Sequence, residues 1–63
     1  MICIKKKRLE AGMSQEDLAS AVGVFQSTVS GWEKGNSIPQ PKNLKRIAEA
    51  LNCTIAELLK EDG

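Results

Sequence analysis

The sequence predicts an all-α fold, a small bundle of five short helices in one domain that spans residues 1–63. Apolar residues recur at intervals of three and four rather than in alternation, which is the spacing of helices that bury one face. Glycines stand where these apolar stretches end, and aromatic residues make up only 3% of the chain. The 41% hydrophobic content is enough for a helical core in 63 residues, a length near the lower limit for an unaided domain.

The first of two central helices is predicted over Gln15–Val22. Ser14 is a suitable N-cap, because its hydroxyl can accept a hydrogen bond from an N–H one turn into the helix. Asp17 can accept a bond from the backbone of Ser14 in return, as in a capping box. Gly23 ends the helix, since a residue without Cβ adopts a positive φ at little cost. The apolar residues that share one face are Leu18, Ala19 and Val22.

The second central helix is predicted over Gln26–Lys34, after a tight turn of about three to four residues. Val29 and Trp32 form its buried side, and the small Ala19 permits the two helices to cross closely. A polar helix face that a partner helix holds outward can enter a DNA major groove, which is about 12 Å wide. The small or polar residues of that outer face are Gln26, Ser27, Ser30 and Gly31.

Three further helices complete the predicted bundle. They are Ile2–Ala11 with Gly12 as its C-cap, Lys42–Leu51 followed by a left-handed Asn52, and Ile55–Lys60 behind a capping box of Thr54 and Glu57. The side chains expected to complete the core are Ile4, Leu9, Met13, Val24, Ile38, Leu44, Ile47, Ala48, Leu51, Ile55, Leu58 and Leu59. Lys45 and Arg46 are expected in solvent.

The motifs that carry a family resemblance are Ser14-Gln15, Leu18-Ala19, Gly23-Val24, Ser27-Thr28-Val29-Ser30, Trp32-Glu33 and Gly35. Over roughly Ile4 to Lys60, the chain resembles the lambda-repressor-like (Cro/cI, XRE-type) helix-turn-helix family. The resemblance implies a compact five-helix bundle whose second and third helices form the helix-turn-helix. It also implies a sequence-specific double-stranded DNA-binding transcriptional regulator, of repressor type, with its third helix in the major groove. The alternative is a protein-interaction module on the same scaffold, of antitoxin, anti-repressor or co-activator type.

The start of the third helix holds the candidate base contacts. Gln26 can pair bidentately with adenine N6 and N7, which is worth about 1–3 kcal/mol of discrimination. Ser27 and Thr28 each reach a base or a phosphate, or merely cap the helix. Ser30 lies on the exposed side one turn later.

Two residues depart from the family pattern. Phe25 stands where a Ser or Thr usually caps the recognition helix. Its ring contacts a thymine methyl or folds back onto the core, unless the helix starts later with Ser27 as its cap. Gly31 stands where a long polar side chain usually reaches a base, and it weakens the helix by up to about 1 kcal/mol relative to alanine. Fewer direct base contacts and more use of DNA shape follow from this.

Candidate phosphate contacts flank the groove. The Gln15 side chain and the free N–H groups of its helix point the same way, which suits a phosphate oxygen. In the family, residues at the positions of Lys34, Asn36 and Ser37 meet the backbone beside the groove, and Lys42 adds one more contact.

A structural ion pair is also implied by the resemblance. In the family, an arginine of the first helix often pairs with a glutamate at the end of the recognition helix, and Arg8 and Glu33 match those positions. The planar guanidinium suits this place, because it can hold a carboxylate bidentately. The alternative is that Arg8 is one more solvated charge.

The charge of the chain is unevenly distributed. The net charge is only +1, but residues 1–46 carry eight Lys and Arg against four Asp and Glu. In residues 47–63, Lys60 stands against four carboxylates. Such a dipolar molecule can orient its basic half on phosphate, although solvated faces that simply differ in sign are the alternative.

An enzyme is not expected, because the chain has no histidine, no tyrosine and no glycine-rich phosphate loop, and its serines lack a base. Cys3 and Cys53 cannot complete a four-ligand zinc site, so no metal or cofactor is expected. They are expected to be reduced thiols, although a disulfide is geometrically conceivable.

The expected partner is double-stranded DNA, with no small-molecule substrate and no membrane contact. One such domain buries too little surface for tight specificity, so a homodimer on palindromic half-sites is expected, formed in solution or only on DNA. The chain has no apolar run near 18 residues and no signal peptide, which favours a soluble cytoplasmic protein.

Overall fold

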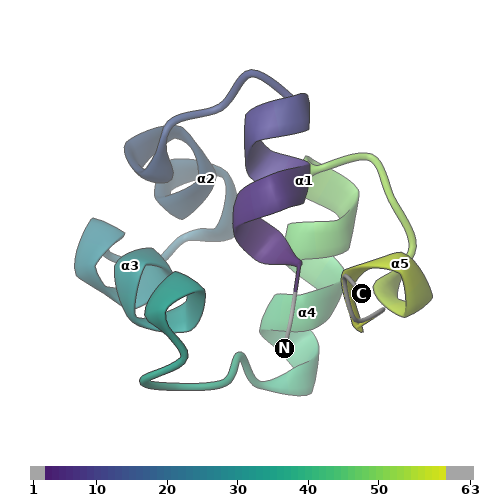
Figure 1. The fold of residues 1–63 in the computed structure, drawn as a ribbon. Coiled ribbons are helices and arrows are strands. Elements are labelled where there is room, and N and C mark those ends of the chain that lie inside the picture. The colour runs from purple at the N-terminus through teal and green to yellow at the C-terminus, as the bar shows by residue number, and fades with distance from the viewer. Residues whose placement is uncertain (1–2, 60–63) are drawn as a thin grey trace.

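Five helices and no strand make up residues 3–59, the part of the chain that a computed structural model describes. This confirms the all-α prediction. In Figure 1, α2 and α3 lie together on one side of the molecule, α4 runs behind α1, and α5 lies on the far side from α2 and α3. The helices in order are α1 (Ile4–Glu10), α2 (Gln15–Val22), α3 (Gln26–Lys34), α4 (Pro41–Ala50) and α5 (Ile55–Leu59).

The bounds of α2 and α3 agree with the prediction, and those of the other helices differ slightly. α1 begins at Ile4 behind its N-cap Cys3, and the predicted first residue Ile2 lies outside the described residues. α4 begins one residue early, because Pro41 fits the first turn, where a missing N–H costs nothing. α5 ends at Leu59, and the predicted last residue Lys60 also lies outside the described part.

Two capping boxes form as predicted and start α2 and α5. The Ser14 hydroxyl accepts from the Asp17 N–H at 3.0 Å, and the Asp17 carboxylate accepts from the Ser14 N–H at 2.9 Å. Thr54 and Glu57 form the same pair of bonds at 3.0 and 3.1 Å. These backbone hydrogen bonds stabilise the charged carboxylates and lower the pKa of both Asp17 and Glu57.

The tight turn between α2 and α3 depends on Gly23. This residue has a φ of 87°, a conformation that costs a residue with a Cβ additional energy. The N–H groups of Gly23 and Val24 both donate to the carbonyl of Ala19, so the last turn of α2 is closed. Ala19 itself is 4% exposed, where its small side chain lets α3 pack closely on α2.

The core is one cluster to which every helix contributes. Trp32 and Val29 are both buried, which confirms the predicted inner face of α3, and Met13 and Val24 pack against the cluster from outside. Burial of these apolar side chains is the main stabilising contribution in a domain of this size. The buried hydrophobic residues are Ile4, Leu18, Ala19, Val22, Val29, Trp32, Ile47, Ala48, Leu51 and Leu58.

Four predicted core residues are exposed instead. Leu9 is 58% exposed, because Ile4 and Arg8 occupy the inner face of α1 and the next residue turns about 100° away. Ile38 is 79% exposed, since the buried loop residue is Pro39. On the short α5 only Leu58 points inward, which leaves Ile55 and Leu59 at 39% and 49% exposed.

Candidate nucleic-acid interface

The start of α3 is set by Phe25, which is the N-cap residue and has an extended backbone (φ −76°, ψ 152°). Its carbonyl accepts from the N–H of Thr28 at 3.0 Å, so the helix begins at Gln26. The alternative of a later start with Ser27 as cap is therefore wrong. The Phe25 ring is 82% exposed, so it does not fold back onto the core.

The outer face of α3 is polar and accessible. Gln26 and Ser27 are exposed, and Thr28 and Ser30 are half-buried, while Val29 and Trp32 hold the opposite face in the core. The α2–α3 packing thus turns a row of hydrogen-bonding side chains away from the molecule. A convex helix with such a row is suited to a groove lined by donors and acceptors.

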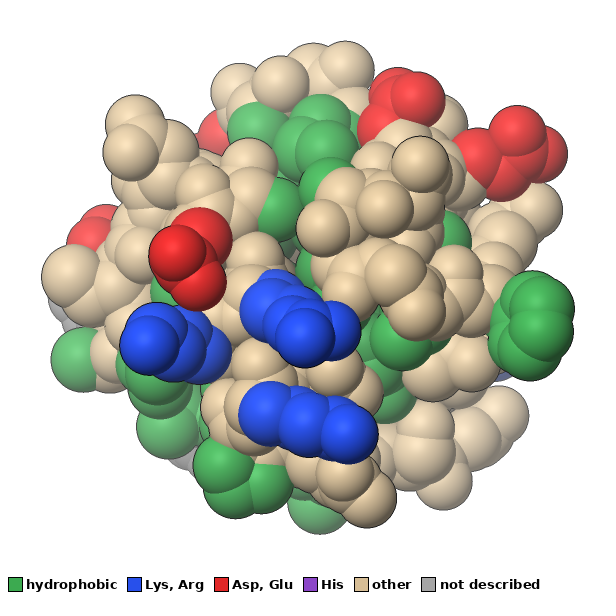
Figure 2. Space-filling view, turned by 180° about the vertical axis from the view of Figure 1, so that it is seen from behind, with side chains coloured by type: hydrophobic (Ala, Val, Ile, Leu, Met, Phe, Trp, Pro, Cys, Tyr) green, Lys and Arg blue, Asp and Glu red, His purple; other side chains and the backbone are tan. Residues whose placement is uncertain are grey.

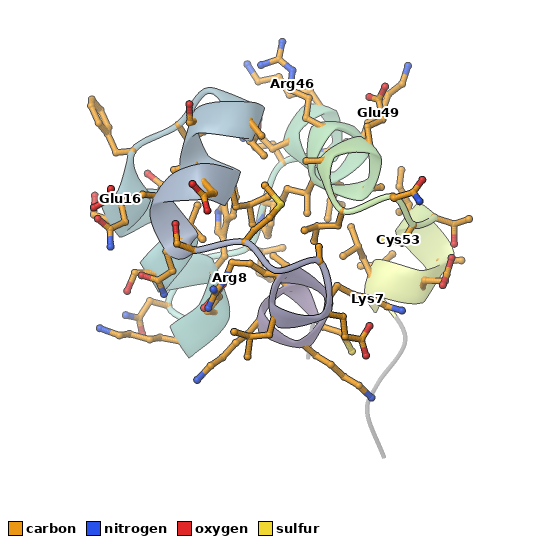
Figure 3. All side chains as sticks on the ribbon, turned by 90° about the horizontal axis from the view of Figure 1, so that it is seen from above. Lys7, Arg8, Glu16, Arg46, Glu49 and Cys53 are labelled. Carbon is orange, nitrogen blue, oxygen red and sulfur yellow. The ribbon has the colours of Figure 1, made fainter. Side chains whose placement is uncertain are left out.

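Arg8 and Glu33 form a bidentate ion pair that joins α1 to α3. The Arg8 Nε donates to Glu33 Oε2 at 2.7 Å, and Nη2 donates to Oε1 at 3.1 Å. The third contact of the guanidinium is Nη1 to the carbonyl of Met13 at 2.8 Å. The two charged side chains are only 8% and 4% exposed, and Figure 3 shows Arg8 directed inward among the helices.

The pKa values of the pair reflect opposing causes. Burial by itself raises the pKa of Glu33, but the hydrogen bonds from Arg8 and Gln15 and the positive charge of Arg8 outweigh it and lower that pKa. The hydrogen bond to Glu33 likewise raises the pKa of Arg8 against the effect of burial. The pair is therefore ionised throughout the neutral range.

Gln15 connects this ion pair to the outer face of α3. Its Nε2 donates to Glu33 Oε1 at 3.1 Å, and its Oε1 accepts from Gln26 Nε2 at 3.4 Å. The amide is half-buried between α2 and α3. Gln15 was predicted to contact phosphate, Gln26 to contact a base, and Arg8 and Glu33 to form a structural ion pair. The structure brings these residues together through the Gln15 side chain.

The remaining predicted phosphate contacts lie beside the end of α3 and the start of α4. Lys34, Asn36, Ser37 and Lys42 are all exposed. The loop lies against α3, because the N–H groups of Asn36 and Ser37 donate to the carbonyl of Gly31 at 2.9 and 3.4 Å. A Cβ at Gly31 would be 3.2 Å from the Ser37 hydroxyl, so the glycine allows this close approach.

Sequence reasoning missed the role of Arg46. This residue was expected in solvent, and it is exposed, but its Nη1 also donates to the carbonyl of Val22 at 3.4 Å. The bond satisfies a carbonyl at the end of α2. No local pattern predicts it, since the two residues lie 24 positions apart. Figure 2, the view from behind Figure 1, shows basic side chains gathered over α4. Lys42 and Lys45 are exposed on the same helix.

The cysteines, the candidate metal ligands and the lengths of the helices in residues 3–59 bear on other kinds of site. Neither Cys3 nor Cys53 is joined in a disulfide, and burial raises the pKa of the Cys53 thiol, with the charge of Glu57 adding to the effect. Residues 3–59 contain no group of His, Cys, Asp or Glu able to hold a metal ion. None of the helices in that range has the length and apolar character needed to cross a bilayer.

The fold and the motif are shared with known regulators. RstR, the cryptic phage CTXphi transcriptional repressor of Vibrio cholerae, is 31% identical over 58 residues, which are 92% of this chain and 52% of RstR. An uncharacterized HTH-type transcriptional regulator of Methanothermobacter thermautotrophicus is 41% identical over 63 residues, and the match covers 95% of this chain and 91% of the relative. The chain thus spans about half the length of RstR and most of the archaeal protein.

Two solved structures are similar along nearly the whole chain. The P22 c2 repressor in complex with a synthetic operator has a TM-score of 0.86 and 34% identity, over 94% of this chain and 89% of the repressor chain. The N-terminal DNA-binding domain of SinR from Bacillus subtilis has a TM-score of 0.83 and 32% identity, over 94% and 87% of the two chains. Residues 4–58 match the helix-turn-helix family itself. The chain therefore belongs to the helix-turn-helix family and is of the lambda-repressor-like (XRE) type.

Proposed function

We propose that the chain is a sequence-specific transcriptional regulator of repressor type that binds double-stranded DNA through α3 in the major groove. The observation that carries this proposal is the outward polar face of α3, with Gln26 and Ser27 exposed and Val29 and Trp32 in the core. The operator complex of the P22 c2 repressor, which has the same fold, supports DNA as the partner. Bound protein would exclude polymerase from a promoter that overlaps the site.

Base contacts are assigned to the first turns of α3. Gln26 is the principal reader, since its exposed amide carries both a donor and an acceptor. Ser27, Thr28 and Ser30 contribute shorter contacts along the same helix. The exposed ring of Phe25 supplies an apolar contact for a thymine methyl at the edge of the site.

Phosphate contacts set the register of the domain on the duplex. Gln15 meets one strand from the first turn of α2, where N–H groups without a helical partner also face outward. The side chains of Lys34, Asn36, Ser37 and Lys42 meet the backbone beside the groove, and all four are exposed. These contacts carry affinity and salt dependence but no sequence information.

Two copies of the chain occupy a palindromic site as a homodimer, because one small domain buries too little surface for tight, specific binding. Ile55 and Leu59 on α5 support this, since they are apolar, partly exposed and four residues apart on one helix. Leu59→Glu should lower the affinity for a palindromic duplex at least tenfold and leave that for a single half-site unchanged. Equal effects on the two duplexes would exclude dimerisation through α5.

A regulator of this kind acts in the cytoplasm.

The proposal is tested by selection of random duplexes against the purified chain, followed by titration of the selected duplex at several salt concentrations. A binding constant that falls steeply with salt, and that falls further on Gln26→Ala or Gln15→Ala, supports the proposal. Lys45→Ala on the outer face of α4 is the matched surface control. Absence of duplex binding even at low salt contradicts the proposal.

A second candidate is a protein-interaction module on the same scaffold. The exposure of Phe25 at 82% favours it, because aromatic side chains, Phe among them, are enriched at protein–protein interfaces. The two functions differ in the response to substitution. Phe25→Ala lowers the affinity for a protein partner while Gln26→Ala does not, whereas both substitutions weaken binding to a DNA site.

A further inference from the structure

The hydrogen bonds around Gln15 have a direction that the chemistry of Glu33 imposes. An ionised carboxylate has no hydrogen to donate, so it can only accept. Gln15 must therefore present its NH₂ group to Glu33, and the bond from Nε2 to Oε1 is 3.1 Å long. The other side of the same amide, its carbonyl oxygen, is then turned toward Gln26.

The direction passes on to Gln26 in the same way. The Gln15 Oε1 can only accept, and Gln26 donates to it from Nε2 at 3.4 Å. Gln26 is thereby left with its Oε1 and the second hydrogen of Nε2 for the exterior, where the residue is exposed. Its outward edge offers one acceptor and one donor.

This edge matches one purine and not the other. In the major groove adenine presents a donor at N6 and an acceptor at N7, whereas guanine presents acceptors at both O6 and N7. A glutamine amide that shows an acceptor and a donor is complementary to adenine. The reversed amide would show two donors and would be complementary to guanine.

The geometry points to Glu33 as a positioning residue that, through Gln15, fixes the amide orientation of Gln26 and so selects adenine over guanine. This inference rests on the proposed function, because it concerns the base that the same α3 surface reads. Arg8 takes part by holding the Glu33 carboxylate in place with two hydrogen bonds, at 2.7 and 3.1 Å. Neither Glu33 nor Arg8 needs to touch DNA for this effect.

The test reverses the direction of the chain of hydrogen bonds. In Gln15→Lys the ammonium can donate to Glu33 and also to the Gln26 oxygen, which turns the Gln26 NH₂ group outward. Glu16→Lys is the matched control, since it places a lysine at an exposed residue in the same turn of α2 that is not part of this chain of hydrogen bonds. Each variant is subjected to selection on random duplexes, and the base pair read by Gln26 is identified as the one whose preference disappears in Gln26→Ala.

At that base pair the unmodified chain and Glu16→Lys should prefer A·T over G·C by roughly fivefold or more. Gln15→Lys should reduce this ratio at least fivefold, toward or past equality, and should have no such effect in a Gln26→Ala background. Glu33→Gln, whose amide can donate as well as accept, should also lower the ratio, with circular dichroism used to verify that it folds. A change of base preference is a readout that loss of packing alone would not produce.

The outcomes separate the inference from the proposed function. A Gln15→Lys variant that binds DNA with an unchanged preference for A·T overturns the inference and leaves the proposed function standing. The same holds if Gln26→Ala alters the preference at no position, or if folded Glu33→Gln retains the full ratio. If the unmodified chain binds no duplex at any salt concentration, the proposed function fails and the inference fails with it.

Discussion

At the scale of single residues, the buried Arg8–Glu33 pair is highly sensitive to substitution. Both side chains are nearly inaccessible, at 8% and 4%, so removal of one leaves the other charged, buried and without its partner. Glu33→Ala should lower the free energy of unfolding by about 3–5 kcal/mol, as is typical when a buried pair is broken. That loss is comparable to the whole stability expected of so small a domain, about 3–9 kcal/mol. Urea and thermal unfolding measure it.

The control for that measurement is Glu10→Ala. Glu10 faces Lys7 at 3.7 Å, but its side chain is 56% exposed, so the effect should be below about 1 kcal/mol. Similar losses in the two variants would mean that burial of the Arg8–Glu33 pair adds nothing to its contribution.

The lowered pKa of Glu33 predicts how stability depends on pH. The folded pKa lies below the ordinary value of 4.5, so the unfolded chain binds more protons at acid pH. The contribution of Glu33 to stability is complete above about pH 5.5 and decreases as the pH falls through 4.5 toward the folded pKa. Asp17, also with a lowered pKa, acts in the same direction.

Urea titrations between about pH 7 and pH 3 measure this dependence. Glu33→Gln should unfold at lower urea at neutral pH and should lose less stability on acidification than the unmodified chain. Parallel pH profiles would show that Glu33 has the same pKa in the folded and unfolded states.

At the scale of helices, the features that could be predicted best from the sequence are those that local interactions determine. The bounds of α2 were predictable because Ser14 and Gly23 act on its two ends, and the end of α3 was predictable because Gly35 caps it. The exposure of Ile38 was not, since it depends on which residue of a proline-rich loop turns inward, and the buried one is Pro39. The bond from Arg46 to Val22 joins two helices, so no local spacing indicates it.

The same distinction holds for the candidate interface. The periodicity of Val29 and Trp32 was enough to predict that Gln26 points outward. The hydrogen bonds that tie Gln26 through Gln15 to Glu33 could not be predicted, because they require the distances between three helical positions. The outward position of Gln26 was therefore predictable from the sequence, and the structure supplied its connection to Gln15 and Glu33.

Gly31 permits a prediction about how closely the loop after α3 packs against that helix. Alanine in a helix interior is more favourable than glycine by about 1 kcal/mol, but a Cβ here would be 3.2 Å from the Ser37 hydroxyl. Gly31→Ala should therefore stabilise the chain by up to about 1 kcal/mol in a Ser37→Ala background, and by about 0.5 kcal/mol less in the unmodified chain. A double-mutant cycle in urea measures the difference, and strict additivity would show that the loop yields to the new methyl group freely.

At the scale of the whole molecule, the uneven charge distribution gives the chain a direction in the field of a duplex. The net charge of +1 conceals an excess of Lys and Arg in residues 1–46. Part of that excess lies on α4, where basic side chains gather in the view of Figure 2. α4 carries Lys42 in its first turn, next to the loop that holds Asn36 and Ser37, and Lys45 further along. Of the two lysines, only Lys42 is expected to contact phosphate.

Lys42→Ala and Lys45→Ala separate local contact from overall charge, because both remove one exposed positive charge from the same helix. A lysine that neutralises a phosphate contributes about 0.9 to the slope of log K against log salt concentration. Lys42→Ala should reduce the slope by about that amount and weaken binding to all duplexes alike, while Lys45→Ala should leave the slope nearly unchanged. Equal reductions in the two variants would mean that the duplex extends over the outer face of α4, or that the field of the whole molecule, rather than one contact, sets the salt dependence.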